Sequence, residues 1–251
     1  ILEKLKKETG SPNYIFIHTT QNYLQETMGG WNEIGIRPVS ILNGGDTFSY
    51  LGAVEKEEYK SDINYIGGRW LFKAKNIDRL LLPLCEFPSK YKIKIFGNTP
   101  WPTNQYLGQI NDDEAKHVFK SAVICPNISE PHSYIYSDLV ERLWKIPLSD
   151  GLLVSDKACD LYNIFPDGYN ICCPTFDSPN ELSSLVDYYK KYPEIRKDLI
   201  WKQKRCVLRN GTYFHRCSKM LEELGLLDES KKILDTYKLK YKDLLKEYNV
   251  D

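Results

Sequence analysis

The sequence lacks the features that mark several large classes of protein. It carries no net charge, because 34 lysines and arginines balance 34 aspartates and glutamates, so no bulk field attracts nucleic acid or anionic lipid. No apolar run approaches the roughly 20 residues of a membrane-spanning helix, and the start of the chain shows no signal-peptide core. These absences argue against a nucleic-acid coat and a membrane protein, and they predict a cytoplasmic one.

Signatures of metals and cofactors are also scarce. The seven cysteines include no CxxC pair, and the neighbours Cys172 and Cys173 are unsuited to bridging each other, so we expect reduced, mostly buried thiols and no zinc. Neither GxGxxG nor GxxxxGK[ST] occurs, so a standard dinucleotide or P-loop site has no support. The first residue is Ile rather than Met, which suggests a fragment, a processed chain or a trimmed start.

The sequence does contain enough apolar material for a core, with 42% hydrophobic residues in a chain of 251. Short apolar runs alternate with longer segments of helical period, which predicts a Rossmann-like α/β fold: a parallel sheet with helices on both faces. Strands are expected at residues 14–17, 38–42, 63–66, 91–96, 122–125 and 152–154, and helices at 20–33, 112–120, 139–146 and from 194 onward. Ser178, Pro179 and Glu181 form a typical helix start.

A break in this pattern suggests how the chain is divided. The Asn-Gly-Gly-Asp run at 43–46 is the strongest interruption, and we expect a domain hinge there. The predicted parts are a partial N-terminal β-α-β segment at 1–45, a Rossmann-like domain at 46–225 and an amphipathic helix at 226–251.

Ligands of open α/β sheets lie beyond the carboxyl ends of the strands, so the loops that follow strands are the places to search. Gly67 and Gly68 allow close backbone approach, and Arg69 adds a forked donor for phosphate oxygens. A second loop runs from Gly97 to Trp101, whose indole either stacks on a base or packs over the strand ends.

The densest segment is the helix that contains Glu141, Arg142 and Lys145. Charges within an otherwise apolar helix are costly to bury unless they are paired or bound to a ligand. The carboxylate can accept from ribose hydroxyls and the two cations can neutralise a diphosphate. The alternative is an internal pair between Glu141 and Lys145, four residues apart on the helix.

A series of short runs follows the chain in a characteristic order: residues 62–67, 95–97 with Trp101, 106–108, 122–127, 141–147 with Gly151, Ser155-Asp156, 165–168, and a closing Gly-Thr-Tyr-Phe-His-Arg run at 211–216. In order and spacing they resemble the C-terminal half of GT-B glycosyltransferases, and most closely the CgeB-like branch of the group 1 enzymes. The resemblance covers about 165 residues, from roughly 62 to 225.

This resemblance implies a two-domain transferase that needs no bound metal or other cofactor. Its C-terminal half would bind a nucleoside-diphosphate sugar, and its N-terminal half would dock a glycan or another acceptor. The implied donor contacts are Gly67, Gly68 and Arg69 at the diphosphate, Gly97 to Trp101 at the base, Glu141, Arg142 and Lys145 at the ribose and phosphates, and Asn127 and Ser155 nearby. Arg142 and Lys145, with Arg69, are candidates for stabilising the charge on the leaving diphosphate.

Two departures from the family pattern matter. Many relatives have a glutamate in a Phe-Glu step where this chain has Trp144-Lys145, so either Glu141 contacts the ribose or the donor contact has changed. Only residues 1–43 precede the hinge, which is short for an N-terminal lobe, so the partner that completes it is expected to be the rest of a larger polypeptide.

Two histidines are candidates for acid–base chemistry. His18 follows a predicted strand and is placed to face the cleft from the N-terminal side, and His132 lies in a loop that reaches the donor. A single histidine after a strand is also a common capping or packing residue.

Two other classes of function compete with glycosyl transfer. One is a non-catalytic interaction module that binds a protein partner through the terminal helix or the tyrosine-rich surface, since the chain has 18 tyrosines. The other is a reductase or methyltransferase on a similar sheet, which the missing glycine fingerprint weakens.

Overall fold

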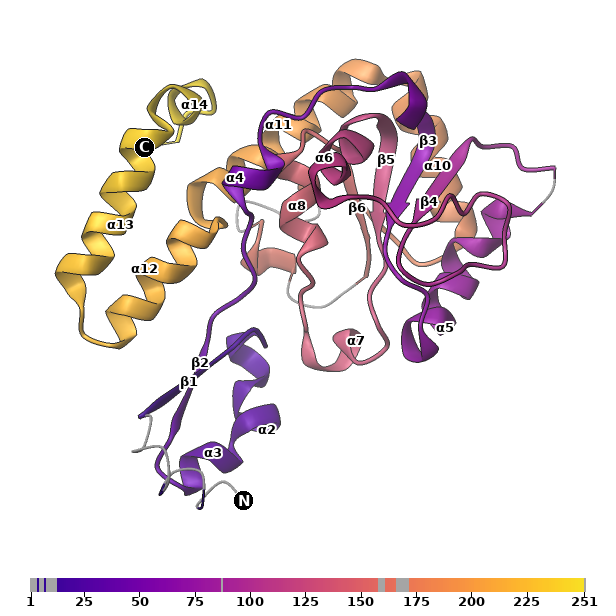
Figure 1. The fold of residues 1–251 in the computed structure, drawn as a ribbon. Helices are drawn as coiled ribbons and strands as arrows, with labels where there is room; N and C mark the ends of the chain where they lie inside the picture. The colour runs from indigo at the N-terminus through magenta and orange to yellow at the C-terminus, as the bar shows by residue number, and fades with distance from the viewer. Residues whose placement is uncertain are drawn as a thin grey trace.

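The computed structural model describes residues 4, 7, 13–86, 88–157, 161–165 and 172–250. Cys159 and the end of the 165–168 run therefore lie outside the described residues. Three parts of the chain are visible in Figure 1: a small N-terminal unit, a larger sheet with helices, and a group of helices at the C-terminus.

The N-terminal segment, residues 13–42, is a β-α-β piece as expected from the sequence. Its strands β1 (Tyr14–Ile17) and β2 (Arg37–Ser40) pair in parallel, and the helices α2 (Leu24–Met28) and α3 (Gly30–Glu33) connect them. The sequence predicts one helix over 20–33, but the structure divides it at Gly29, which is the last cap of α2 and the first cap of α3. Glycine disfavours a helix interior, and this explains the break.

The main sheet contains five parallel strands in the order β4-β3-β5-β6-β7 within the described residues. The strands are β3 (Ser61–Ile66), β4 (Ile93–Phe96), β5 (Ala122–Asn127), β6 (Leu153–Asp156) and β7 (Thr175–Phe176). The parallel pairing confirms the expected α/β class, and β7 has only two residues, which is too short for a sequence pattern to reveal.

Helices cover both faces of this sheet, as Figure 1 shows. The connecting helices are α4 (Thr47–Tyr50), α5 (Leu71–Leu80), α6 (Asp112–Lys120), α7 (Ser133–Tyr136), α8 (Arg142–Leu148), α10 (Pro179–Lys191) and α11 (Pro193–Asn210). Ile124 and Cys125 are successive residues of β5 and point to opposite faces of the sheet. Ile124 packs in a core with residues of α5 and α10, and Cys125 packs in another core with residues of α6, α8 and α11. Two apolar layers therefore hold the sheet between them.

The C-terminal part is helical as expected, with α12 (Tyr213–Glu223), α13 (Leu227–Lys240) and α14 (Lys242–Glu247). The single helix predicted over 226–251 is divided at Tyr241, which leaves helical geometry at φ −109° and ψ 21°. Its ring packs against Tyr237 and Phe214, so tertiary contacts and not a Gly or Pro mark this break. None of the described helices is long and apolar enough to cross a bilayer.

Candidate functional site

The strand order locates the place where this sheet can bind a ligand. After β3 the chain moves outward to β4 and then returns past β3 to β5, so the direction of winding reverses between β3 and β5. In open parallel sheets, ligands bind beyond the carboxyl ends of the strands at this point of reversal. Ile66 is the last residue of β3 and Asn127 is the last of β5.

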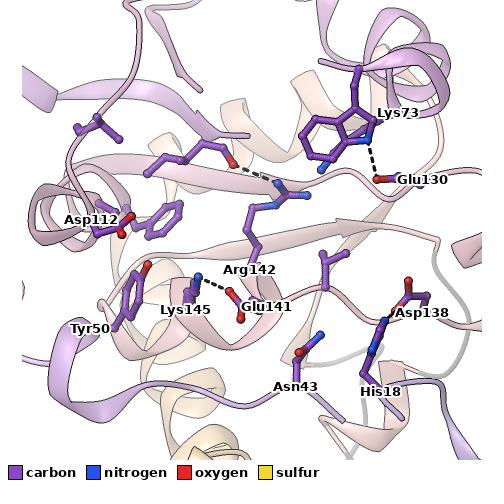
Figure 2. Close-up of a pocket in the computed structure, with 16 residues that line it drawn as sticks. His18, Asn43, Tyr50, Lys73, Asp112, Glu130, Asp138, Glu141, Arg142 and Lys145 are labelled. Carbon is purple, nitrogen blue, oxygen red and sulfur yellow. Dashed lines mark hydrogen bonds and ion pairs between the residues drawn. The ribbon is translucent and has the colours of Figure 1, made fainter. Parts of the chain in front are cut away.

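A hollow of about 420 Å³ opens there, and we call it the cleft pocket (Figure 2). The N-terminal segment, the residues that follow it and the helices around the sheet all contribute to its wall. The polar side chains that line it are His18, Asn43, Tyr50, Lys73, Asp112, Glu130, Asp138, Glu141, Arg142 and Lys145. Of the residues proposed from the sequence, it brings together His18, Glu141, Arg142 and Lys145.

Arg142 connects the two strand ends. Its Nη1 donates to the Ile66 carbonyl at 3.1 Å and its Nη2 donates to the Ile128 carbonyl at 3.1 Å, while Nε and Nη2 approach Asn127 Oδ1 at 3.4 and 3.3 Å. The guanidinium also lies 5.0 Å from the centre of the Tyr65 ring. These hydrogen-bond partners are carbonyl and amide oxygens without a full negative charge, so the positive charge of Arg142 remains available to an anion.

Lys73 is the cation that sequence reasoning missed. It comes from α5, is 3% exposed and lines the cleft pocket. Burial, and then the charge of Arg142, lower the pKa of Lys73 to about 7. Among the described residues no carboxylate forms an ion pair with it, and its ammonium lies 5.0 Å from the centre of the Trp70 ring.

Lys145 and Glu141 form the internal pair that the sequence offered as the alternative to a ligand contact. The Lys145 ammonium pairs with one carboxylate oxygen of Glu141, and the Tyr213 hydroxyl donates to the other at 2.9 Å. Burial alone would raise the pKa of Glu141, but Lys145 holds it below its usual value. Lys145 also lies over the Tyr50 ring, with 5.3 Å from the ammonium to the ring centre. The pair still faces the pocket, as Figure 2 shows.

His18 meets an acidic residue from the other side of the pocket. Its Nε2 lies 3.0 Å from Asp138 Oδ1, and His132 Nε2 lies 3.3 Å from the other carboxylate oxygen. The hydrogen bond with Asp138 raises the pKa of His18 above its ordinary value. Burial alone would raise the pKa of Asp138, yet the two imidazoles hold it below its usual range. The carboxylate orients His18 toward the pocket, as in an imidazole–carboxylate dyad.

A buried polar network fixes the loop that follows β5. Asn127 donates to Ser129 Oγ at 3.2 Å and to Ser155 Oγ at 3.1 Å. Asp156 accepts from the Ser129 amide at 2.5 Å and from the Tyr134 hydroxyl at 2.6 Å, and burial raises the pKa of this carboxyl. Asn127 and Ser155 do not line the cleft pocket, but Asn127 accepts from Arg142, which does, and Ser155 accepts from Asn127.

The glycines proposed for the site lie at a close approach of two loops. A Cβ at Gly67 would fall 2.7 Å from Arg142 Nη1, and a Cβ at Gly97 would fall 2.3 Å from the Gly67 carbonyl oxygen. Gly68 packs against Trp70 in the same loop. A side chain at Gly97 would push apart the loops after β3 and β4, and one at Gly67 would displace the Arg142 guanidinium.

The structure favours one of the two alternatives for Trp101 and places Arg69 in an ion pair outside the pocket. Trp101 is buried, donates from Nε1 to the Gly67 carbonyl at 3.2 Å and packs edge-on against Tyr65, so it packs over the strand ends. Arg69 forms a forked ion pair with Asp78, from Nε at 2.8 Å and Nη2 at 2.6 Å. Neither side chain lines the cleft pocket.

The residues missed from the sequence share one property. Lys73, Glu130, Asp138 and Tyr213 reach the site from α5, from the segment between β5 and α8, and from α12, and only Lys73 leaves a local signal. It occupies the same helical stripe as Ile77 and Leu80, both fully buried. A lysine in an apolar stripe is a buried charge in need of an explanation.

The described residues contain no group of three or more His, Cys, Asp or Glu side chains that could hold a metal ion.

Comparison with known proteins assigns the family. A model of the "Glycosyl transferase-like" family matches residues 74–222, which is more than half of the chain. The chain belongs to this glycosyl transferase-like family. No curated protein matches the sequence, and the CgeB-like subtype stays a prediction.

Solved structures show the fold of this glycosyl transferase-like protein. A mutant of T4 phage β-glucosyltransferase in complex with UDP-glucose matches at a TM-score of 0.58 and 15% identity, over 90% of this chain and 63% of that one. HepE from Anabaena in complex with UDP matches at 0.65 and 11% identity, over 89% and 74%. Sucrose-phosphate synthase from Thermosynechococcus elongatus matches at 0.57 and 11%, over 92% and 63%.

These similarities confirm a GT-B fold and the expected family. At such low identities the structures show the fold alone. The chain spans less than two thirds of the T4 phage enzyme, at 63% of its length.

Proposed function

We propose that this protein transfers a sugar from a nucleoside-diphosphate sugar to an acceptor, with the donor's diphosphate bound in the cleft pocket. The observation that carries the proposal is Lys73, a buried ammonium without an acidic partner among the described residues, which lines a pocket at the point where the sheet reverses its winding. A buried charge without a partner is costly, and a phosphate oxygen would supply one.

The neighbouring groups support this assignment. Arg142 is held by carbonyl and amide oxygens, so its charge adds to that of Lys73. Together the two cations can stabilise the negative charge that develops on a leaving diphosphate. Glu141, with the Tyr213 hydroxyl on its carboxylate, supplies acceptors for sugar or ribose hydroxyls. Structures with the same fold hold UDP or UDP-glucose.

For the acceptor side we propose His18 as the group that removes a proton from the attacking hydroxyl. It lies in the N-terminal segment and is oriented by Asp138 at 3.0 Å. Asp138 favours the neutral imidazole that carries its proton on Nε2, so Nδ1 of His18 is unprotonated and can act as a base. The acceptor is a glycan or another hydroxyl compound, and the partner that completes the acceptor lobe is the rest of a larger polypeptide.

Two further expectations remain proposals. We infer that donor binding needs no metal, although one structure of the T4 phage enzyme holds UDP and Mn²⁺. We also infer a cytosolic location, which the free thiols of Cys85, Cys125, Cys173 and Cys217 support.

The test is isothermal titration calorimetry with UDP, GDP and TDP, each with and without EDTA. We expect one of the nucleotides to bind, and its affinity to be the same with EDTA. The absence of heat with all three would contradict the proposal and favour an interaction module that binds a protein. A loss of binding in EDTA that Mn²⁺ restores would contradict metal independence alone.

A further inference from the structure

The Gly-Thr-Tyr-Phe-His-Arg run at 211–216 connects two parts of the molecule that are far apart in sequence. It covers the junction after α11 and the first turn of α12, and the linker at 43–46 passes directly against it. The Gly45 amide donates to the Gly211 carbonyl at 2.8 Å, and the Tyr213 amide donates to the Gly45 carbonyl at 3.1 Å. These bonds make an isolated parallel bridge between Gly45 and Thr212. The predicted hinge is therefore attached to the sheet body by its backbone.

Gly44 shows how closely the two segments approach. A Cβ at this position would lie 3.0 Å from the Tyr213 amide nitrogen and 3.1 Å from the Thr212 carbonyl carbon. Both atoms belong to the backbone, so neither can move aside as the end of a flexible side chain would. Any side chain here would push the linker away from the 211–216 run.

Arg216 adds a side-chain attachment at the same place. Its Nε donates to the Asn43 carbonyl at 2.9 Å and its Nη1 donates to the Asn210 carbonyl at 3.1 Å. Burial lowers the pKa of Arg216 to about 10, so the side chain is still charged at neutral pH. No ion pair with a carboxylate is found for it among the described residues. The two carbonyl oxygens, which belong to the linker and to the end of α11, therefore fix its position.

The linker leads back to the residues that face the cleft pocket. Asn43 donates from its side chain to the Leu139 carbonyl at 2.8 Å, one residue beyond Asp138. Farther back, Ser40 donates to the Thr19 carbonyl at 2.7 Å, and Thr19 bridges Asp138 beside the His18 pair. The N-terminal segment thus contacts the sheet body at Asp138 and through its linker. The Asn22 side chain also donates to the Tyr162 hydroxyl, so several separate attachments define the orientation of this segment, whereas one would allow it to rotate.

We propose that Arg216 is a positioning residue that holds the linker by the Asn43 carbonyl and so sets the N-terminal segment where His18 meets Asp138 at the pocket. The placement stands independently of the proposed function, and only its consequence for sugar transfer rests on that function.

A second arginine serves as the matched control. Arg37 of β2 also reaches α12, through an ion pair with Glu223 at 3.1 Å, but its side chain is 63% exposed. Exposed ion pairs contribute little, because water competes for both charges. Arg37→Ala removes a contact between the same two parts of the chain without touching the linker.

The experiment compares Arg216→Lys and Arg37→Ala with the wild-type chain by hydrogen exchange and by NMR titration of the histidines, with His18 assigned from a His18→Gln variant. Lysine keeps the charge but cannot reach both carbonyls. For Arg216→Lys we expect amide exchange across 37–46 to rise by about tenfold, as the loss of a hydrogen bond to a charged group implies. We also expect the pKa of His18 to fall toward its ordinary value as Asp138 separates from it. Arg37→Ala should change neither quantity.

Gly44→Ala provides a second route to the same displacement, since it lifts the linker and leaves Arg216 in place. It should reproduce both changes. The proposal is overturned if both variants leave the exchange of 37–46 and the His18 titration unchanged, or if exchange rises equally in β3 and β5, which would indicate general destabilisation.

UDP affinity separates this inference from the proposed function. The cations of the pocket belong to the sheet body, so UDP affinity should stay within about threefold in Arg216→Lys. Once a donor and an acceptor are known, kcat should fall while the KM for the donor is unchanged. If the wild-type chain binds no nucleotide but the variants show the expected exchange and titration changes, the proposed function is disproved and the role of Arg216 stands.

Discussion

Two buried lysines at opposite ends of the main sheet show what distinguishes a structural charge from a functional one. Lys204, on α11, is 4% exposed and pairs with Asp150 at 2.7 Å, in the turn before β6. Lys73, on α5, is 3% exposed and has no acidic partner among the described residues. The first ion is neutralised within the chain, at the amino end of a strand. The second lies at the carboxyl ends, where under the proposed function a phosphate of the donor is its partner.

The comparison implies different consequences when each charge is removed. Burying an ion without a partner costs free energy, so its removal should not destabilise the protein. Breaking a buried pair leaves the other charge unsatisfied, so its removal should destabilise it. UDP affinity should fall when the unpaired charge of Lys73 is removed and stay the same when the paired charge of Lys204 is removed.

The largest effect is expected for Lys73→Met. UDP affinity should fall by about 10- to 100-fold, because a hydrogen bond between a charged group and a phosphate is lost, while the free energy of unfolding should stay the same or rise. Calorimetry and chemical denaturation measure the two quantities. Lys75→Met, on the exposed face of the same helix, is the control and should change neither. An unchanged affinity would remove the main support for the donor site.

Lys204→Met tests the other half of the comparison. The free energy of unfolding should fall by about 1–3 kcal/mol, since Asp150 loses one of its two cationic partners, and UDP affinity should not change. Lys120 keeps its bond to Asp150 at 3.1 Å, which limits the loss. Denaturation and calorimetry again provide the measurements. Weaker UDP binding with normal stability would show that the two ends of the sheet are coupled.

The elements of the fold could largely be predicted from the sequence, because each depends on local patterns. The helix predicted at residues 112–120 is α6 of the structure. The Ser178 hydroxyl accepts from the Glu181 amide at 3.2 Å, as its predicted position at a helix start requires. The α/β class and the β-α-β segment are confirmed for the same reason.

The site could be predicted only in part, because its contacts are not local. Arg142 was identified from its unusual place in an apolar helix, but the meeting of His18 with Asp138 joins residues 120 positions apart. No pattern within one segment contains such a pair. Lys73 is an intermediate case, since its place in the stripe with Ile77 was visible and its lack of a partner was not.

The pH dependence of UDP binding sharpens the comparison further. Without ligand the pKa of Lys73 is about 7, and an adjacent diphosphate would raise it, so binding takes up a proton above pH 7. UDP affinity should therefore fall by about fivefold between pH 7 and pH 8. Calorimetry in two buffers of different ionisation enthalpy measures the proton taken up. Lys73→Arg, which remains charged, should show no such uptake.

The lowered pKa of Lys73 also makes the stability of the folded chain depend on pH, and here stability rises as pH rises. The pKa of Lys73 is lower in the folded chain than its value of about 10.4 in an unfolded one, so the folded state bears the full penalty below pH 7. That penalty is relieved as pH rises from 7 toward the unfolded value. The stability gained by Lys73→Met should therefore shrink over this range, and a constant difference would contradict the assigned cause.

The smallest effect is expected for Arg69→Ala. The sequence proposes Arg69 as a diphosphate ligand, whereas in the structure both arms of its guanidinium are taken by Asp78 on the exposed side of α5. Since surface ion pairs are worth about 0–1 kcal/mol, stability should change little, and UDP affinity should change by less than about threefold. Asp78→Asn, which frees the guanidinium, should be equally silent. Arg69→Ala could instead weaken UDP binding as much as Lys73→Met. Asp78 would then have to release the arginine when the nucleotide binds, and a paired charge would be as functional as an unpaired one.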